Sequence, residues 1–185
     1  ADTAAVYAAQ GAANGVDGLG NEAVSISGTS SAAADLKAID AATSGVVTVA
    51  STTITGSYSD LNTVYTANED GTIAGLGDEA ITAGTINVAN ANTLSAFTTG
   101  LLTATISDNN MSTLDGITES GHALTISVTD TSVAASNLNT LDGKTTETVA
   151  VTSATITGSA SDVATTYAAQ GSTISGLGNE AVSIS

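Results

Sequence analysis

The chain has no cysteine, no proline and no tryptophan among its 185 residues, and phenylalanine occurs once, at Phe97. Without cysteine it has neither a disulfide framework nor thiol chemistry. Aromatic residues make up 3% of the chain, although 42% of it is hydrophobic, and the mean hydropathy is +0.25. The apolar material is therefore mostly Ala, Val, Ile and Leu. Small and β-branched residues suit thin cores in which similar layers stack, whereas a globular enzyme normally uses more large aromatic anchors.

Basic residues are also scarce: 2 Lys and Arg stand against 18 Asp and Glu, for a formal charge of −16. Nucleic-acid binding depends on Lys and Arg that neutralise phosphates, so this composition argues against it and against anionic membranes. Because no apolar run approaches the roughly 20 residues of a membrane span, we expect no membrane insertion. The acidity either keeps the chain soluble or attracts cations, of which calcium suits an extracellular setting.

One motif recurs along the chain. Residues 18–27 read Gly-Leu-Gly-Asn-Glu-Ala-Val-Ser-Ile-Ser and return unchanged at 176–185, and a relative, Gly-Leu-Gly-Asp-Glu-Ala-Ile-Thr, occupies 75–82. We call residues 18–22, 75–79 and 176–180 the first, second and third cassette. Tyr-Ala-Ala-Gln-Gly precedes the first and third cassettes, at 7–11 and 167–171. Since the chain ends in the phase in which it starts, we expect it to be an excerpt of a longer repetitive chain.

A short helical signal also recurs: a polar stretch, often ending in Asp or Asn, leads to apolar residues three positions apart. Such spacing places both apolar side chains on one helix face, and the preceding Ser, Asp or Asn are natural N-caps. The signals are Asp2-Thr3 with Val6, Asp35-Leu36 with Ile39, Asp60-Leu61 with Val64, Thr93-Leu94 with Phe97, Asn110-Met111 with Leu114, Asn137-Leu138 with Leu141, and Asp162-Val163 with Thr166-Tyr167. The six intervals from Thr3 to Val163 average about 27 residues.

Between these signals lie short runs of alternating, β-branched residues, bounded by Gly, Asn, Asp and Ser. The runs are 24–26, 47–49, 53–55, 86–88, 103–106, 124–128, 149–151, 154–156 and 182–184. Each is too short for a sheet of its own but fits one rung of a stacked sheet. We therefore predict a mainly β repeat solenoid of short stacked strands with a short helical turn in most coils. Residues 1–185 would form a single continuous repeat domain of about seven coils, each of roughly 27 residues.

Catalytic chemistry has little support. His122 is the only histidine, and we interpret it as an ordinary residue of a turn, because no nucleophile elbow or His cluster accompanies it. Paired carboxylates such as Asp35 with Asp40 would suit a glycoside-cleaving enzyme, but the basic and aromatic residues that hold sugars are missing. The Thr-rich runs lack the regular array of an ice-binding surface. We therefore expect that the protein is not an enzyme.

Calcium is the better chemical hypothesis. Stacked repeats would place Glu22, the pair Asp78 and Glu79, and Glu180 at equivalent turns, next to glycine carbonyls and Asn or Asp oxygens, which are the ligands that calcium prefers. No complete 12-residue EF-hand loop is present. The other interpretation is that Asp and Asn form caps and turns while the Glu side chains stay solvated.

Three phrases carry a resemblance to a known group: Gly-Ser-Tyr-Ser-Asp-Leu-Asn-Thr at 56–63, Asn-Leu-Asn-Thr-Leu-Asp at 137–142 and Gly-Leu-Gly-Asn-Glu-Ala-Val at 176–182. They resemble tandem repeats of giant secreted proteins of marine unicellular cyanobacteria, a group that includes a cell-surface protein linked to swimming. The resemblance covers most of the chain and implies a type-I-secreted, calcium-rich structural role. The chain lacks the Gly-Gly-x-Gly-x-Asp nonapeptides of calcium-binding secretion repeats, which argues against a calcium-roll fold.

We therefore expect an extracellular or cell-surface structural protein that forms a stalk, filament or surface layer and associates with itself. The alternative is an adhesin or a phage tail-fibre shaft whose recognition tip lies outside these residues. Expected further partners are a surface glycan or a divalent cation.

Overall fold

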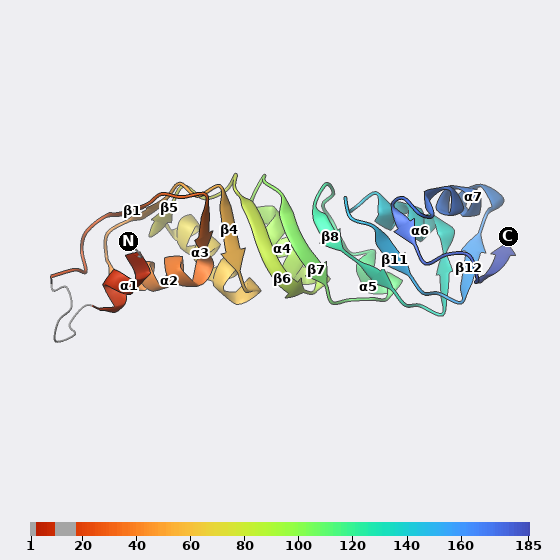
Figure 1. Cartoon of the computed structure of the whole chain (residues 1–185), viewed down its shortest axis with the longest axis horizontal. Helices are drawn as coiled ribbons and strands as arrows, with labels where there is room; N and C mark the ends of the chain where they lie inside the picture. Colours follow the sequence, from red (N-terminus) through yellow and green to blue (C-terminus); the bar gives the residue numbers. More distant parts are fainter. Residues whose placement is uncertain (1–2, 10–17) are drawn as a thin grey trace. The chain divides into compact units, whose positions relative to one another are not determined.

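The computed structural model describes residues 3–9 and 18–185. Within them the chain forms seven α-helices: α1 (Thr3–Ala8), α2 (Ala33–Ala42), α3 (Tyr58–Asp70), α4 (Val88–Phe97), α5 (Met111–Leu114), α6 (Ala135–Asp142) and α7 (Ala160–Ala169) (Figure 1). The strands are β1 (Val24–Ile26), β2 (Ser30–Ala32), β3 (Val47–Val49), β4 (Thr53–Gly56), β5 (Ile73–Ala74), β6 (Ala80–Ile86), β7 (Leu102–Ile106), β8 (Ala123–Thr125), β9 (Ser127–Val128), β10 (Ser132–Ala134), β11 (Val149–Val151), β12 (Thr155–Gly158), β13 (Ile174–Ser175) and β14 (Ala181–Ile184).

The chain divides into two compact units, which are described separately. The first unit comprises residues 1–84 with 96–100, and the second comprises residues 85–95 with 101–185. The single continuous repeat domain over 1–185 stays a prediction.

In the first unit, two sets of parallel strands run side by side, in the orders β1-β3-β5 and β2-β4-β6. The register pairs Val24 with Val47 and Thr53 with Ala80, so each strand pairs with one 23 to 27 residues further along the chain. Inward residues such as Val47, Ile54 and Ile81 are fully buried. Helix α2 packs against both α1 and α3, and the apolar residues of α2 and α3 close the core opposite the strands.

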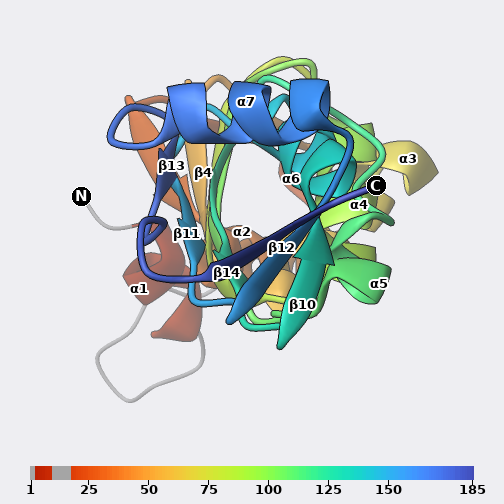
Figure 2. The same cartoon turned by 90° about the vertical axis from the view of Figure 1, so that its right-hand side faces the viewer.

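In the second unit, parallel strands form the sets β9-β11-β13 and β10-β12-β14, and β7 pairs with β8. Figure 2 shows α7 along one side, β11 and β13 along a second, and β10, β12 and β14 along the third. The core between them is aliphatic and includes Leu138, Val149 and Ile156. Helices α6 and α7 are direct neighbours.

Small residues allow successive helices to come this close. The start of α2 presents Ala33 to Gly56 at the end of β4, and a side chain at position 56 would lie 3.1 Å from the Ala33 Cβ. Ala135 at the start of α6 lies in the same way beside Gly158. Ala33 and Ala135 are both fully buried, so larger residues would push the layers apart.

The prediction of a mainly β solenoid is wrong. Within the described residues the fold is α/β, 35% helical and 29% strand, and none of its parallel sheets forms a solenoid. The reason is helix length: apolar residues three apart predicted single turns, whereas α2, α3 and α7 contain 10, 13 and 10 residues. In α2 and α7, alanines around the apolar residues extend the helix, because alanine has the highest helix propensity.

The positions of the helices and of most strands are confirmed, since the described residues of all seven helical signals lie in helices or at their N-caps. Asp2, the first residue of the first signal, lies outside the described residues. The predicted strand over 86–88 is wrong beyond Ile86. There the Asn87 side chain accepts a hydrogen bond of 2.8 Å from the Asn90 N–H and starts α4 instead.

No helix among the described residues combines the length and the apolar character needed to span a membrane.

Candidate functional site

The predicted calcium ligands lie in the three cassettes, and in each cassette the glutamate has a tyrosine as its partner. The Tyr7 hydroxyl donates to Glu22, that of Tyr65 to Glu79, and that of Tyr167 to Glu180. Each tyrosine lies on the helix that precedes its cassette: α1, α3 or α7. The sequence reasoning did not find these tyrosines. The signal was available, because Tyr7 and Tyr167 belong to the repeated Tyr-Ala-Ala-Gln-Gly stretch.

Each glutamate also folds back over its own turn. The Glu79 carboxylate accepts hydrogen bonds from the Gly77 N–H at 2.8 Å and from the Asp78 N–H at 3.3 Å. The same two amides of the first and third cassettes donate to Glu22 at 2.8 and 3.2 Å and to Glu180 at 2.8 and 3.0 Å. We call this group, a tyrosine hydroxyl and two backbone N–H groups around one carboxylate, the Tyr–Glu link.

Burial differs among the three links. In the second cassette Tyr65 is 1% exposed and Glu79 is 3% exposed, and Phe97 stacks on the Tyr65 ring with centroids 5.2 Å apart. Glu22 and Glu180 are partly exposed. The central link is therefore shielded from water, which strengthens its hydrogen bonds and raises the cost of removing either partner.

The first and third links shift the pKa values of both their partners, and the second link shifts the pKa of its tyrosine. Burial, with the hydrogen bond to Glu22, raises the pKa of Tyr7 to about 12, and the bonds from Tyr7 and the Gly20 amide lower the pKa of Glu22 to about 2. Burial and the Glu79 carboxylate raise the pKa of Tyr65 well above its usual value. Burial raises the pKa of Glu180, but the hydrogen bonds from Tyr167 and the backbone outweigh it and leave that pKa lowered. The first and third links thus favour an ionised glutamate and a neutral tyrosine, and the second favours a neutral tyrosine.

The cassette backbone contacts the layer that precedes it. Gly75 has a φ of +89°, and a Cβ at this position would lie 2.4 Å from the Val49 carbonyl oxygen. Gly176 has a φ of +88°, and a Cβ at this position would lie 2.1 Å from the Val151 carbonyl oxygen. Only glycine meets both conditions. The next N–H, that of Leu76 or Leu177, donates to a side-chain amide of the preceding helical segment, Asn68 or Gln170.

The cassette also contacts the layer that follows it. The Thr98 hydroxyl donates to the Glu79 carbonyl at 2.5 Å, and the Thr99 N–H donates to the Gly77 carbonyl at 2.9 Å. Next, Gly100 passes so close to the Glu79 carbonyl that a Cβ would lie 2.3 Å from it. Residues 43–45 make the same contacts with the first cassette. The Thr43 hydroxyl donates to the Glu22 carbonyl at 2.7 Å, and the Ser44 N–H donates to the Gly20 carbonyl at 2.8 Å. A Cβ at Gly45 would lie 2.1 Å from the Glu22 carbonyl oxygen.

As for calcium, the structure brings only one pair of predicted ligands together. Asp78 and Glu79 line a hollow of about 330 Å³ with Ser51 and Gly75. The donors that surround the Glu79 carboxylate would compete with a cation for its oxygens. No group of three or more Asp, Glu or His side chains in the described part of the chain is placed to hold a metal ion. Calcium at Glu22, Asp78, Glu79 and Glu180 stays a prediction.

Other acidic side chains cap helices. Asp60 accepts a hydrogen bond of 2.8 Å from the Ser57 hydroxyl at the start of α3, and Asp162 pairs in the same way with Ser159 at α7. Of the Ser, Asp and Asn residues predicted as N-caps, the serines take that position here, and the aspartates lie in the first helical turn. Asp108 reaches back to the Val88 N–H at the start of α4, at 2.7 Å. Negative charge is favourable at these helix N-termini.

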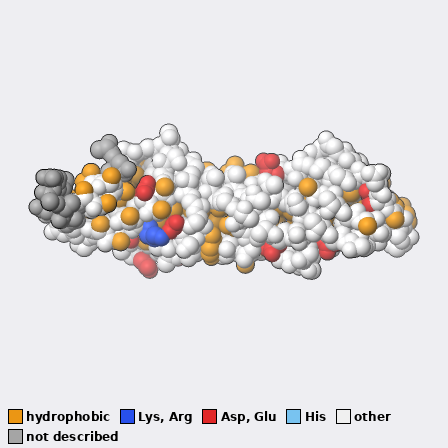
Figure 3. All heavy atoms as spheres, turned by 60° about the horizontal axis from the view of Figure 1, so that its bottom comes forward, with side chains coloured by type: hydrophobic (Ala, Val, Ile, Leu, Met, Phe, Trp, Pro, Cys, Tyr) orange, Lys and Arg blue, Asp and Glu red, His pale blue; other side chains and the backbone are white. Residues whose placement is uncertain are grey.

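The acids that are visible from one side do not form a patch. On the face drawn in Figure 3, the red side chains lie apart from one another and most of the surface is uncharged. Lys37 of α2 pairs with Asp60 of α3, and this bond, with the one from Ser57, lowers the pKa of Asp60.

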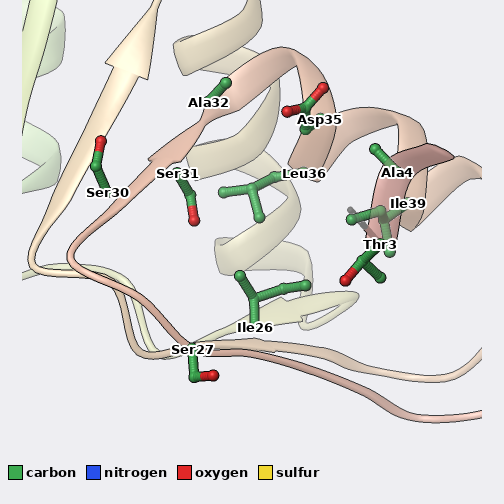
Figure 4. A pocket seen from close by; sticks show the side chains of 10 residues that line it. All are labelled: Thr3, Ala4, Ile26, Ser27, Ser30, Ser31, Ala32, Asp35, Leu36 and Ile39. Atoms are coloured by element: carbon green, nitrogen blue, oxygen red, sulfur yellow. The ribbon is translucent and has the colours of Figure 1, made fainter. Parts of the chain in front are cut away.

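A second cavity, of about 240 Å³, lies in the first unit between α1, the end of β1, β2 and α2. Figure 4 shows Ile26 and Leu36 reaching into it from opposite sides, while the Asp35 carboxylate points away from Ile26. The remaining lining residues are three serines, Thr3, two alanines and Ile39. Because Asp35 is the only titratable side chain among the described residues that line it, the cavity offers no acid–base pair.

His122 has a structural contact. Its Nδ1 accepts a hydrogen bond of 3.1 Å from the Leu102 N–H, and its backbone forms a parallel bridge with Thr145. Burial lowers the pKa of His122. The depression beside the ring has essentially no free volume, so a substrate has no space there.

Comparison with protein-family models, with curated proteins and with solved structures found no match.

Proposed function

We propose that this chain is a structural repeat protein that serves outside the cell, in a stalk, a filament or a cell-surface layer. The observation that carries the proposal is the use of the cassette glutamates. In all three cassettes the carboxylate accepts hydrogen bonds from a tyrosine of the preceding helix and from two amides of its own turn. These carboxylates are the best candidates for chemistry in the chain, and they are engaged in hydrogen bonds within the protein.

The Tyr–Glu link recurs three times and joins a helix to the turn that follows it, which suits a role in stabilising the structure. Its strength comes from charge-assisted hydrogen bonds, which are stronger than those between neutral groups. The cassettes also contact the layers on either side, as Gly75 and Thr98 do for the second cassette. Repeated units that stabilise one another through such contacts suit a role in which length and stiffness matter.

The extracellular part of the proposal rests on composition and resemblance. A cysteine-free chain with a charge of −16 is indifferent to redox conditions and resists precipitation. The resemblance to giant secreted cyanobacterial repeat proteins points to the same place. Calcium would reach this protein most easily at Asp78, whose carboxylate is exposed at the hollow beside the second cassette.

The experiment is immunogold electron microscopy of the source cells with an antibody raised against this chain. Label on the cell surface or along external fibres is expected, and label confined to the cell interior would contradict the proposal. Antibody pre-adsorbed with the purified chain is the control. The adhesin or tail-fibre alternative predicts discrete fibres, each ending in an unlabelled tip.

A further inference from the structure

Paired strands of this protein are joined where they begin by a recurring backbone contact. The first residue of one strand donates its N–H to the carbonyl of the residue that precedes the next strand of the pair. This contact joins Val24 to Val46 at 3.0 Å, Val47 to Thr72 at 2.9 Å, and Val149 to Thr173 at 2.8 Å. Because both groups belong to the backbone, neither takes up a proton near neutral pH.

The contact between β7 and β8 has a different acceptor. Leu102 is the first residue of β7, and His122 is the residue that precedes β8. The Leu102 N–H donates to Nδ1 of the His122 side chain at 3.1 Å, while the His122 carbonyl accepts the Thr146 N–H of the following layer at 2.9 Å. An imidazole therefore stands where the other pairs use a carbonyl, and His122 is the only histidine in the chain.

This hydrogen bond fixes the protonation state of the imidazole. A backbone N–H can only donate, so Nδ1 carries a lone pair and the proton of the neutral ring is on Nε2. Protonation gives both ring nitrogens a hydrogen, and no rotation of the ring then offers Leu102 an acceptor. Leu102 is fully buried, so its N–H would be left without a partner away from water, which costs free energy.

We propose that His122 is an acid-sensitive joint, whose protonation releases the Leu102 N–H and opens the second unit locally between the starts of β7 and β8. The next residues of the two strands pair in register, from Thr103 with Ala123 to Thr105 with Thr125, and keep the strands together beyond the joint. Proton uptake thus loosens one end of the contact and leaves the fold of the unit in place. The inference goes beyond the proposed function and does not depend on it.

The groups around the ring decide at which pH the joint opens. Neither α4 nor β7 contains a titratable residue, and among the other described residues that line the depression beside the ring, Glu119 is the only titratable one. The charge of Glu119 raises the pKa of His122, but burial outweighs it and leaves that pKa below 6.5. In the following layer, the Lys144 ammonium donates to the Thr118 carbonyl, and Glu147 is exposed. The joint is therefore closed at neutral pH and opens in acid.

The first test measures hydrogen exchange at single amides of the full chain by NMR, from about pH 8 to about pH 5, where imidazoles titrate. Dividing by the intrinsic exchange rate at each pH leaves the protection of each amide. The protection of Leu102 should fall by up to about tenfold per pH unit from 6.5 toward the folded pKa, because the open state binds the proton more tightly than the closed state. Val47 and Val149, which donate to carbonyls at the same place in their layers, are the internal controls and should keep their protection.

The matched variant is H122Q, because the glutamine side chain offers a carbonyl oxygen that does not titrate. In H122Q the protection of Leu102 should not depend on pH. In the wild type, the nitrogen chemical shifts of His122 should report the Nε2–H form at neutral pH and titrate together with the protection of Leu102. A fall at Leu102 no larger than at Val47 and Val149 would overturn the inference, and so would an equal fall in H122Q.

The second test uses thiol labelling, because the chain has no cysteine of its own. Ser95 is 7% exposed and lines the depression beside His122, whereas Ser153 of the same unit is 8% exposed and does not line it. The ratio of the labelling rates of S95C and S153C with a dipyridyl disulfide cancels the pH dependence that the two thiols share. This ratio should rise from about pH 8 to about pH 5 and stay constant when H122Q is added. A ratio that does not change with pH, or that changes equally with H122Q, would contradict the inference.

Discussion

The buried Tyr–Glu link of the second cassette allows the sharpest test of what holds these repeats together. The Tyr65 hydroxyl and the Glu79 carboxylate are both nearly inaccessible to water, and two further N–H groups converge on the same carboxylate. Replacing Tyr65 with Phe removes one hydrogen bond to a charged group. A loss of about 1.5–3 kcal/mol in the free energy of unfolding is expected.

Replacing Glu79 with Ala should cost more, because it leaves the buried Tyr65 hydroxyl and two backbone N–H groups without their acceptor. An unsatisfied buried hydroxyl costs about 1–3 kcal/mol by itself. In the double variant no hydroxyl is left to be unsatisfied, so its cost should fall short of the sum of the single variants by about 1–2 kcal/mol.

The assay is urea unfolding followed by far-ultraviolet circular dichroism, with hydrogen exchange as a local readout. Y58F is the matched control on the same helix, since Tyr58 is partly exposed, and should change stability by no more than about 0.5 kcal/mol. Exchange at the Gly77 and Asp78 amides should accelerate in E79A. The reasoning is refuted if Y65F costs no more than Y58F, or if the two single effects simply add.

Three further outcomes are expected. Since the folded pKa of Glu22 is lowered from 4.5 to about 2, its contribution is complete above pH 4.5 and is lost as the pH falls toward 2; E22Q should flatten this part of a plot of urea midpoint against pH, and an unchanged slope would contradict the link. G100A should destabilise by about 2 kcal/mol or more, because its Cβ would lie 2.3 Å from the Glu79 carbonyl, while G84A, whose Cβ meets nothing within 4 Å, should be nearly neutral in the same titration. If calcium binds the predicted ligands, millimolar calcium should raise the melting temperature relative to chelator, and an identical melting temperature would reject that prediction.

The sequence predicted the positions of the helices well, but the prediction underestimated their length and so the share of the fold that is helical. Apolar residues three apart, such as Leu36 with Ile39, marked each helix, because a helix face repeats at that interval whatever surrounds it. The length of α3 could not be predicted from the spacing of apolar residues. Its second half, Thr-Ala-Asn-Glu-Asp, has no periodic apolar residue and is helical through contacts and a C-terminal cap at Gly71. These additional helical turns are what make the fold α/β instead of mainly β.

The cassettes were recognised as the recurring element, but their glutamates were assigned to an ion. Local reasoning saw only oxygen-rich turns. The partners, Tyr7, Tyr65 and Tyr167, lie 13 to 15 residues upstream on another element, and the distance along the chain says nothing about whether two such groups meet. The repeated tyrosine upstream was visible in the sequence, but its role was not.

By itself, the sequence determined the repeat, its phase and the places of most strands and helices, because these follow from local periodicity and from identity between segments. Tertiary structure decided the environment of each copy. Val24 and Val182 stand in identical ten-residue segments, yet one is 9% exposed and the other 47%. Burial depends on which strand lies alongside, and that neighbour comes from a distant part of the sequence.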